Sequence, residues 1–263
     1  MPRVCLCCGR QLLAGERHLC CVCLADLPLT YFEAMVHNPM ADIFNGLVEA
    51  PAYERAYALF YYSGEYCRIT QALKYHRNFR AGKWFARMLG ERVKASGACF
   101  DVVCPVPLHW TRRFSRGYNQ AEVIGREVAA VLGVRFEPRL LRRVRRTGTQ
   151  TKLSAEERKR NIAGAFEVRR PLKPEGRSGA EIPWPPAASE REGPAASAVG
   201  GKERATRAEG FPPRLPAGGK GLRILIIDDV FTTGATVAAC DAALREAFGP
   251  EVRISVATLA FSG

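Results

Sequence analysis

The sequence lacks several features that would restrict its function quickly. No apolar run approaches the length of a membrane-spanning helix, about eighteen residues, and the N-terminus lacks the apolar core of a signal peptide. The G-x-x-x-x-G-K-[ST] pattern of P-loop ATPases is also absent. Acidic residues are fewer than basic ones, 26 against 39, which leaves a net charge of +13. We therefore expect a cytoplasmic protein without a membrane span, with polyanionic partners such as nucleic acid or phosphorylated substrates.

The composition is otherwise that of a globular protein. Its 263 residues are enough for one or two domains, and 47% of them are hydrophobic, which allows a sizeable core. Ten cysteines are present. In a cytoplasmic protein they indicate metal ligands and buried thiols more than disulfides.

Two C-x-x-C pairs near the N-terminus predict a metal site. The first reads C-L-C-C and the second C-C-V-C, with eleven residues between the two pairs. Two tight turns of this kind direct four thiolates at one tetrahedral Zn²⁺, so we predict a structural zinc in a small zinc ribbon. The predicted ligands are Cys5, Cys8, Cys20 and Cys23. Cys7 and Cys21 are alternatives in the same register, His18 is a further candidate, and disulfides or free thiols are the other interpretation.

The stretch Leu222–Val237 organises the rest of the chain. It reads L-R-I-L-I-I-D-D-V-F-T-T-G-A-T-V. The apolar run Ile224–Ile227 predicts a strand buried on both faces, and we expect Asp228 and Asp229 to end it where it leaves the sheet. Apolar residues at helical spacing follow the hydroxyl-rich loop, so a helix should begin there. Ligands bind at this edge of an open α/β sheet.

The loop after the acids has the chemistry of a phosphate site. Free N–H groups at a helix start suit a phosphate, small residues let it approach, and hydroxyls add donors. The residues of this loop are Thr232, Thr233, Gly234, Ala235 and Thr236. The carboxylates of Asp228 and Asp229 can accept hydrogen bonds from sugar hydroxyls or hold Mg²⁺ through water. This order indicates a ribose-5-phosphate site, and an ordinary turn with a threonine N-cap is the alternative.

A second strand–loop–helix unit lies upstream. Asp101–Leu108 predicts another buried strand, and the block R-G-Y-N-Q comes between it and an amphipathic helix. Gly117 frees the backbone there, while the guanidinium of Arg116 can fork onto phosphate oxygens, so the loop suits a pyrophosphate. A solvated basic loop with a helix cap at Asn119 is the alternative.

The remaining segments alternate between expected strands, helices and irregular chain. Residues 24–52 are irregular and predict a tether with one short helix. More than half of the 17 prolines lie in residues 171–219, which predicts a disordered insertion. Further strands are expected at Arg55–Tyr62 and Asn161–Val168, and helices at Tyr66–Tyr75 and Trp84–Val93. Four cysteines in apolar surroundings are expected to be core thiols: Cys67, Cys99, Cys104 and Cys240.

Three blocks together resemble the ComF family. D-D-V-F-T-T-G-A-T is similar to the phosphoribosyl diphosphate (PRPP) signature of type I phosphoribosyltransferases, R-G-Y-N-Q to a second family block, and the double C-x-x-C to its cysteine module. The resemblance implies an α/β fold with a twisted, mostly parallel, type I phosphoribosyltransferase-like sheet flanked by helices. It implies a zinc ribbon and tether at 1–50 and a transferase-like domain at 51–263, where the insertion at 171–219 departs from the family.

The resemblance also implies a function. The chain would be a Mg²⁺-dependent phosphoribosyltransferase acting on PRPP, with Asp228, Asp229 and Arg116 as catalytic residues. The acids would hold ribose, Thr232–Thr236 the 5-phosphate, and Arg116 with Gly117 the pyrophosphate. No residue is an evident recogniser of a base, so the acceptor and the oligomeric state stay open.

Two more segments match family features. Lys74, in A-L-K-Y-H-R-N-F, resembles the family's lysine-bearing segment and would reach a phosphate, a solvated lysine being the alternative. The basic stretch 139–160 resembles the flexible loop that closes over PRPP and includes Arg146 and Gln150. A solvated basic face is the alternative for that stretch.

A second function belongs to another class. The ComF family is associated with DNA uptake in natural transformation, and a zinc ribbon, a basic loop and exposed aromatics suit single-stranded DNA. The aromatics expected to be exposed are Tyr75, Trp110, Phe114 and Tyr118. In this alternative the chain is a non-catalytic competence protein that handles single-stranded DNA, with PRPP as a regulatory ligand.

Overall fold

The computed structural model describes residues 3–48, 53–108, 117–145, 164–169 and 221–263. All of them belong to one compact unit, which comprises residues 1–170 and 212–263. The predicted insertion at 171–219 lies outside the described residues, as do Arg116, Arg146 and Gln150. Among the helices that are described, none is both long and apolar enough to cross a membrane.

A five-stranded sheet forms the centre of the described fold. Its strands are ordered β1-β7-β6-β2-β3, and every neighbouring pair runs parallel. The strands are β1 (Tyr53–Tyr61), β2 (Val102–Pro105), β3 (Arg135–Phe136), β6 (Arg223–Phe231) and β7 (Arg253–Phe261). A separate antiparallel pair consists of β4 (Leu141–Arg143) and β5 (Phe166–Val168). The predicted α/β class with a mostly parallel sheet is therefore confirmed.

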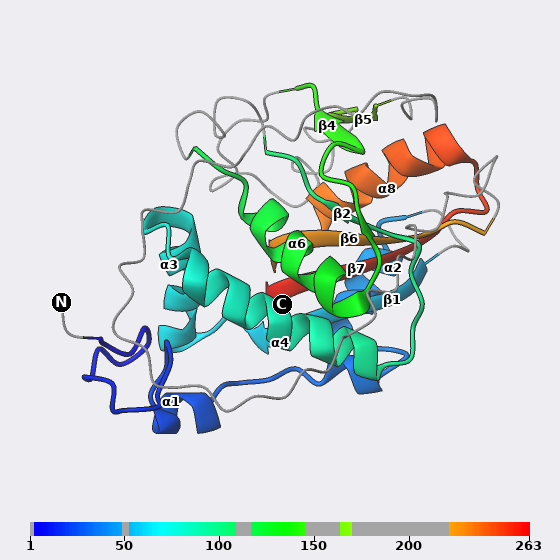
Figure 1. Ribbon diagram of the computed structural model, residues 1–263. Helices are drawn as coiled ribbons and strands as arrows, with labels where there is room; N and C mark the ends of the chain where they lie inside the picture. The colour runs from blue at the N-terminus through cyan, green and yellow to red at the C-terminus, as the bar shows by residue number, and fades with distance from the viewer. Residues whose placement is uncertain (1–2, 49–52, 109–116, 146–163, 170–220) are drawn as a thin grey trace, which may run out of the picture. The chain divides into compact units, whose positions relative to one another are not determined.

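Helices cover both faces of this sheet. Leu225 and Ile227 of β6 pack in one core cluster with α4 and α6, whereas Ile224 and Ile226 pack in a second cluster with α2 and α8. A strand buried on both faces has a continuous apolar run, which is why these four residues contain no polar break. Figure 1 shows α4 and α6 side by side on the near face of the strands. The helices are α2 (Pro39–Asn45), α3 (Cys67–Tyr75), α4 (Phe79–Ala95), α6 (Gln120–Leu132) and α8 (Ala235–Phe248).

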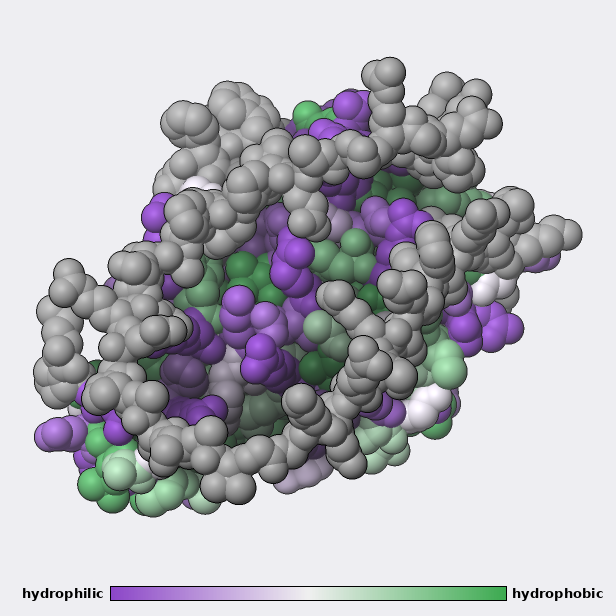
Figure 2. Space-filling view, in the orientation of Figure 1, coloured by the Kyte–Doolittle hydropathy of each residue, from purple (hydrophilic) through white to green (hydrophobic). Residues whose placement is uncertain are grey.

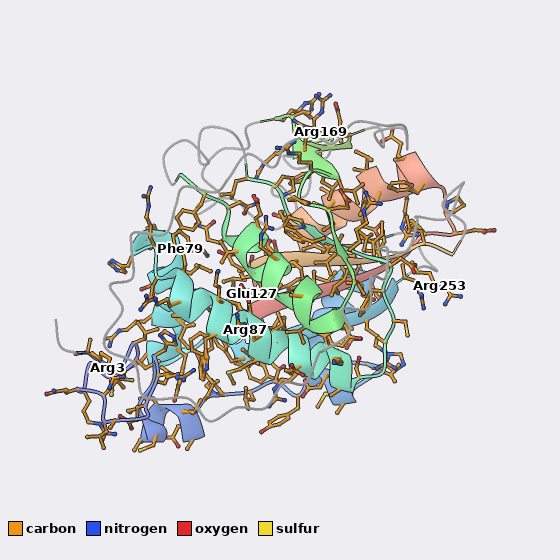
Figure 3. All side chains as sticks on the ribbon, viewed as in Figure 1. Arg3, Phe79, Arg87, Glu127, Arg169 and Arg253 are labelled. Carbon is orange, nitrogen blue, oxygen red and sulfur yellow. The ribbon has the colours of Figure 1, made fainter. Side chains whose placement is uncertain are left out.

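The near face of α4 and α6 carries a group of ion-paired charges. Glu127 of α6 pairs with Arg87 of α4 at 2.8 Å and with Lys83 at 3.5 Å. Figure 3 shows Arg87 and Glu127 next to each other across the two helices, and Figure 2 shows hydrophilic residues gathered at the centre of this face. The two cations are more than half exposed, so these ion pairs contribute little to stability, and one acid against two cations leaves a small positive charge.

Side-chain caps fix where two of these helices begin. Asn119 accepts a hydrogen bond from the N–H of Ala121, so the cap of α6 that belonged to the alternative interpretation of the R-G-Y-N-Q block is present. α4 begins at Phe79, five residues before the predicted start, because Asn78 caps it by accepting from the N–H of Ala81. Gly82 in this first part lets α4 approach α3, since a Cβ there would lie 2.7 Å from Leu73 Cδ1.

The segment expected to be a tether is packed instead. It contains α1 (Cys21–Ala25), a 3₁₀ turn at Phe32–Ala34, and α2. Asn38 caps α2 and also donates to the carbonyl of Ala56 in β1, while Phe44 of α2 is completely buried. Apolar residues without clear periodicity therefore cover part of the sheet here.

The four cysteines that were expected to be core thiols differ in burial. Cys104 and Cys240 are buried, as predicted, but Cys67 is half-buried and Cys99 is exposed. The prediction was wrong for Cys99, which lies in the turn that leads into β2, where apolar neighbours in sequence do not imply burial.

Candidate functional site

The acidic pair lies inside the last part of β6. Asp228 pairs with Thr258 of β7, and the ladder continues to Phe231, so the expectation that the acids end the strand was wrong. The ladder persists because β7 runs alongside as far as Phe261. β2 ends next to the acids, since the N–H of Val106 donates to the carbonyl of Ile227 at 2.8 Å. The loops after β2 and β6 thus leave the same carboxyl edge of the sheet.

The two carboxylates form a compact group with a lysine from α3. The backbone N–H of Asp229 donates to Asp228 Oδ1 at 2.8 Å, and Lys74 Nζ lies 3.0 Å from Asp229 Oδ2. The side chains of Lys74 and Asp229 are only 21% and 15% exposed. Lys74 is therefore an ion-paired residue at the acidic pair, not a solvated one.

Burial and mutual repulsion change how these groups titrate. Burial, followed by the neighbouring charge of Asp229, raises the pKa of Asp228 to about 7, although Lys74 and Arg143 oppose the shift. Burial lowers the pKa of Lys74, but the charge of Asp229 and its hydrogen bond outweigh it and raise that pKa above its ordinary value. Asp228 is thus an acid whose protonation changes near neutral pH.

The loop after β6 leaves the start of α8 without a side-chain cap. Its N-cap residue is Gly234, which rules out the threonine N-cap that was the alternative interpretation. Thr232 is exposed, and Thr233 and Thr236 are half-buried. Uncapped N–H groups at a helix start, with hydroxyls beside them, suit an anion.

Gly234 has a structural requirement of its own. Its φ of 71° favours glycine, and a Cβ there would lie 2.6 Å from Phe231 Cζ and 2.9 Å from Leu47 Cδ1. The glycine therefore belongs to the packing beneath the loop, whatever binds above it.

The G-Y-N part of the R-G-Y-N-Q block is anchored on both sides. Gly117 has a φ of 78°, and a Cβ there would lie 2.7 Å from Arg77 Nη2. Asn119 Nδ2 donates to the carbonyl of Val106 at 2.9 Å, and the hydroxyl of Tyr118 donates to the carbonyl of Leu73 in α3. α3 therefore connects this block to the acidic pair, because Lys74 follows Leu73 directly.

Tyr118 corrects an expectation. It is buried, with its ring centroid 4.7 Å from that of Phe79 in an edge-to-face contact, so it offers no exposed stacking surface. Tyr75 is exposed as expected. Trp110 and Phe114 lie outside the described residues.

The four predicted metal ligands converge at the N-terminus. The Sγ atoms of Cys5, Cys8, Cys20 and Cys23 all lie within 4.8 Å of one another. Cys7 is buried away from them, and Cys21 is exposed. His18 contacts the ring of Trp84 instead. The arrangement of thiols is one that can hold a metal ion such as zinc.

The surroundings of the cysteine cluster favour thiolates at some positions. Burial alone would raise the pKa of Cys5, but hydrogen bonds from the backbone N–H groups of Cys8, Cys20 and Cys7 outweigh burial and lower the pKa to about 7. A backbone N–H from Cys23 lowers the pKa of Cys20 in the same way. Burial raises the pKa of Cys7 to about 12, which agrees with its place outside the cluster.

Three residues near the carboxyl edge were not singled out from the sequence. Arg143 of β4 acts on the charge of Asp228, and Arg77 lies against Gly117. Gln120 is buried, and its Nε2 has no hydrogen-bond partner among the described residues. Each had only an indirect signal in the sequence: Arg77 lies in the segment of Lys74, Gln120 ends the R-G-Y-N-Q block, and Arg143 belongs to the basic stretch 139–160.

Several curated proteins are similar to the chain. Competence protein F of Haemophilus influenzae is 24% identical, covering 80% of this chain and 75% of its own length. DNA utilization protein YhgH of Salmonella typhimurium is 25% identical over 90% and 88%, respectively. Its namesake in Escherichia coli K12 is 26% identical over 66% and 81%. No family model matches the chain.

These relatives agree with the sequence blocks described above. The matches extend over most of the chain, and the double C-x-x-C, the R-G-Y-N-Q block and the D-D-V-F-T-T-G-A-T stretch are the parts that resemble the ComF family. The similarity to these competence and DNA utilization proteins supports the resemblance to the ComF family.

Proposed function

We propose that the carboxyl edge of the sheet binds PRPP with Mg²⁺ and that the chain is a phosphoribosyltransferase. The observation that carries the proposal is the acidic pair of β6 placed directly before the uncapped start of α8. Sugar hydroxyls need acceptors and a 5-phosphate needs N–H donors, and these two requirements meet in consecutive residues. The loop after β2, which leaves the same edge, would receive the pyrophosphate through Arg116 and Gly117.

The acidic pair fits Mg²⁺ by its donor chemistry. Asp228 and Asp229 offer hard oxygen ligands, and Mg²⁺ is commonly held by one or two carboxylates together with phosphate oxygens and water. When bound, Mg²⁺ would neutralise the pyrophosphate leaving group. Lys74, which pairs with Asp229 at 3.0 Å, already supplies a cation to this place.

The chain's own residues would act on the ribose. As the bond from ribose C1 to pyrophosphate breaks, positive charge develops on C1 and the ring oxygen, and a lone pair of the acceptor forms the new bond. Asp228 and Asp229 would hold the ribose hydroxyls with their negative charge close to the developing cation. Lys74 would hold the carboxylate of Asp229 in place through their ion pair.

The cysteine cluster fits a structural zinc. Zn–S bonds of about 2.3 Å in a tetrahedron place the sulfurs about 3.8 Å apart. Cys8 Sγ and Cys20 Sγ lie 3.7 Å apart, which supports such a site. The module also rests on the transferase-like part, because Tyr66 donates to the carbonyl of Cys23 at 3.3 Å.

Calorimetric titration of the full chain with PRPP and Mg²⁺ tests the main proposal. We expect saturable binding that requires Mg²⁺. A screen of acceptors for pyrophosphate release would then identify the reaction. Absence of PRPP binding in folded, metal-loaded protein would refute the proposal.

The names of the relatives favour a second function, the handling of single-stranded DNA. Two relatives are named for DNA utilization or competence, and the net charge of +13 suits a nucleic-acid partner. In this function PRPP would be a regulatory ligand. Tight, salt-sensitive binding of single-stranded DNA without turnover of PRPP would favour it over catalysis.

A further inference from the structure

A cavity adjoins the carboxyl edge of the sheet. It has a volume of about 370 Å³ and lies between the end of β2 with the start of α6 on one side and β4 with the end of β5 on the other. Pro107 and Leu108 contribute from the β2 side. The size falls near the lower end of the range of small-molecule sites, roughly 300–1,000 Å³.

The lining of this cavity is strongly cationic. Arg139, Arg142, Arg143 and Arg169 face a single acid, Glu122. Arg142 is engaged by Glu167 outside the cavity at 2.6 Å. Arg139 and Arg169 are exposed and take part in no ion pair among the described residues. An excess of guanidinium groups around an open volume is an arrangement that binds phosphate oxygens.

The backbone holds these arginines in place. Arg142 and Arg143 belong to β4, which pairs with β5, and the N–H of Arg169 donates to the carbonyl of Leu140 at 2.9 Å and so extends the pairing. Arg143 lies over the ring of Phe166, 5.3 Å from its centroid. Figure 3 shows Arg169 at the β4–β5 end of the molecule. Paired strands of this kind give the cations on them defined positions, which a binding site requires.

Arg143 connects the cavity with the acidic pair. Arg143 both lines the cavity and acts on the charge of Asp228. A ligand in the cavity would lie at the same carboxyl edge of the sheet as a ribose held by Asp228 and Asp229, because the cavity is lined by the residues that follow β2.

We propose that this cavity binds the phosphate monoester of a second ligand and thereby selects an anionic acceptor. That the second ligand is the acceptor rests on the proposed function. The evidence for the phosphate site itself is the group of arginines alone. Glu122 would accept a hydrogen bond from an N–H or O–H of the same ligand. Asn119, the other polar residue at this wall, is already committed to Val106 and Ala121. The monoester belongs either to a free nucleotide or to the 5′ end of a DNA strand.

The test measures phosphate-dependent binding at a protein whose ribose site is filled. Full-length protein saturated with ribose 5-phosphate and Mg²⁺ is titrated with deoxyadenosine monophosphate and with deoxyadenosine. A 5′-phosphorylated oligothymidine and its unphosphorylated twin form the second arm. We expect the phosphorylated member of at least one pair to bind at least about tenfold more tightly.

A double variant assigns the difference to the cavity. Arg139→Gln with Arg169→Gln should remove most of the preference for the phosphorylated probe while leaving ribose 5-phosphate binding unchanged. The control variant is Lys94→Gln with Arg253→Gln, which removes the same amount of charge from two exposed residues, one in the last turn of α4 and one at the start of β7. It should change neither the preference for the phosphorylated probe nor the binding of ribose 5-phosphate. Figure 3 shows Arg253 far from Arg169. Circular dichroism establishes that both variants are folded.

The outcomes separate this inference from the proposed function. If the phosphorylated probes bind through Arg139 and Arg169 but ribose 5-phosphate and PRPP do not bind, the cavity stands and the proposed function fails. If neither pair shows a preference for phosphate, or if the double variant retains it, the inference is overturned. Competition between ribose 5-phosphate and the phosphorylated probe would place both at one site, which also overturns it.

Discussion

The cysteine cluster and the carboxyl edge of the sheet are two candidate binding regions with opposite construction. The cluster takes four groups of one kind from Cys5–Cys23, a single short stretch. The carboxyl edge takes different groups from remote parts of the chain: Lys74 from α3, Gly117 from the loop after β2, Arg143 from β4 and Asp228 from β6. Spacing alone therefore predicts the first region, whereas the second depends on how the strands are ordered.

This difference concerns stability as well as recognition. Removing ligands from a metal cluster removes the bound ion outright, because the remaining groups cannot complete a tetrahedron. At the carboxyl edge each residue contributes one of several hydrogen bonds, so losses should be graded. The predictions below begin with the all-or-none region and end with the smallest graded effect.

The largest effect is expected from Cys8→Ser with Cys20→Ser. Wild-type protein should carry about one zinc per chain, and this variant should carry none. Metal analysis of protein purified under reducing, chelator-free conditions measures both. The cysteine module should also become sensitive to proteolysis, since binding of a structural zinc contributes directly to folding.

A matched variant controls for the loss of two thiols. Cys21 and Cys99 are exposed and lie outside the cluster, so Cys21→Ser with Cys99→Ser should keep the zinc. Wild-type protein without zinc, or equal loss from both variants, would show that the cluster is not the metal site.

Neutralising the acidic pair should give the next largest effect. Asp228→Asn with Asp229→Asn removes both charges at nearly constant size, and charge-assisted hydrogen bonds contribute about 1.5–3 kcal/mol each. PRPP affinity in calorimetry should therefore fall at least about tenfold. Zinc content should stay the same, because the cluster draws no ligand from β6.

A control variant removes the same two negative charges from the surface instead of from the acidic pair. Asp26 and Asp42 are exposed, so Asp26→Asn with Asp42→Asn should leave PRPP affinity within about twofold. If the variant of the acidic pair folds and binds PRPP as tightly as wild type, the proposed site is refuted.

Protonation of Asp228 offers a graded version of the same experiment. Its pKa is raised to about 7 by burial and by Asp229, so Mg²⁺-dependent PRPP affinity should increase by up to about tenfold between pH 6 and pH 8. Asp228→Asn should remove most of this pH dependence. An unchanged pH profile in that variant would contradict the assignment.

The raised pKa of Asp228 also predicts that folding stability decreases as the pH rises, whereas PRPP affinity increases. The folded state takes up the proton more readily than the unfolded chain. The stability that this proton contributes is therefore fully present below the ordinary pKa of Asp, about 4, and is lost as the pH rises through about 7. Denaturant unfolding at several pH values should show a weaker dependence between pH 4 and 7 in Asp228→Asn than in wild type.

Much of the fold could be predicted from local patterns. The run Ile224–Ile227 indicated the central strand, and Asn119 indicated the start of α6. The position of Asp228 inside the strand was not predictable in this way, because the length of β7 determines where the ladder of β6 ends. Burial of Tyr118 likewise depends on the carbonyl of Leu73, which is remote in sequence.

The candidate site likewise has a part that local sequence patterns predict and a part that depends on the folded structure. The acids and the loop that follows them could be located because one strand–loop–helix unit contains them all, and phosphate binding by that loop stays a prediction. The ion pair of Lys74 with Asp229 and the approach of Arg143 required the folded structure, since no spacing in the sequence relates α3, β4 and β6. Side chains that converge from different elements are the part that sequence patterns could not supply.

The smallest effect is expected in the loop Thr232–Thr236, the proposed phosphate site. Here the substituted residue determines whether an experiment reports ligand binding or folding stability. Gly234→Ala would combine a strained positive φ with a contact of 2.6 Å to Phe231, so it would lower folding stability whether or not a phosphate binds. Thr233 is half-buried and not required by such a contact, which makes Thr233→Val the cleaner probe. It removes one hydroxyl donor and leaves the N–H groups at the start of α8, so PRPP affinity should fall about two- to tenfold. Calorimetry with ribose 5-phosphate should show the same loss, because the lost donor serves the 5-phosphate and not the pyrophosphate. A loss confined to PRPP would place the pyrophosphate, rather than the 5-phosphate, at the start of α8.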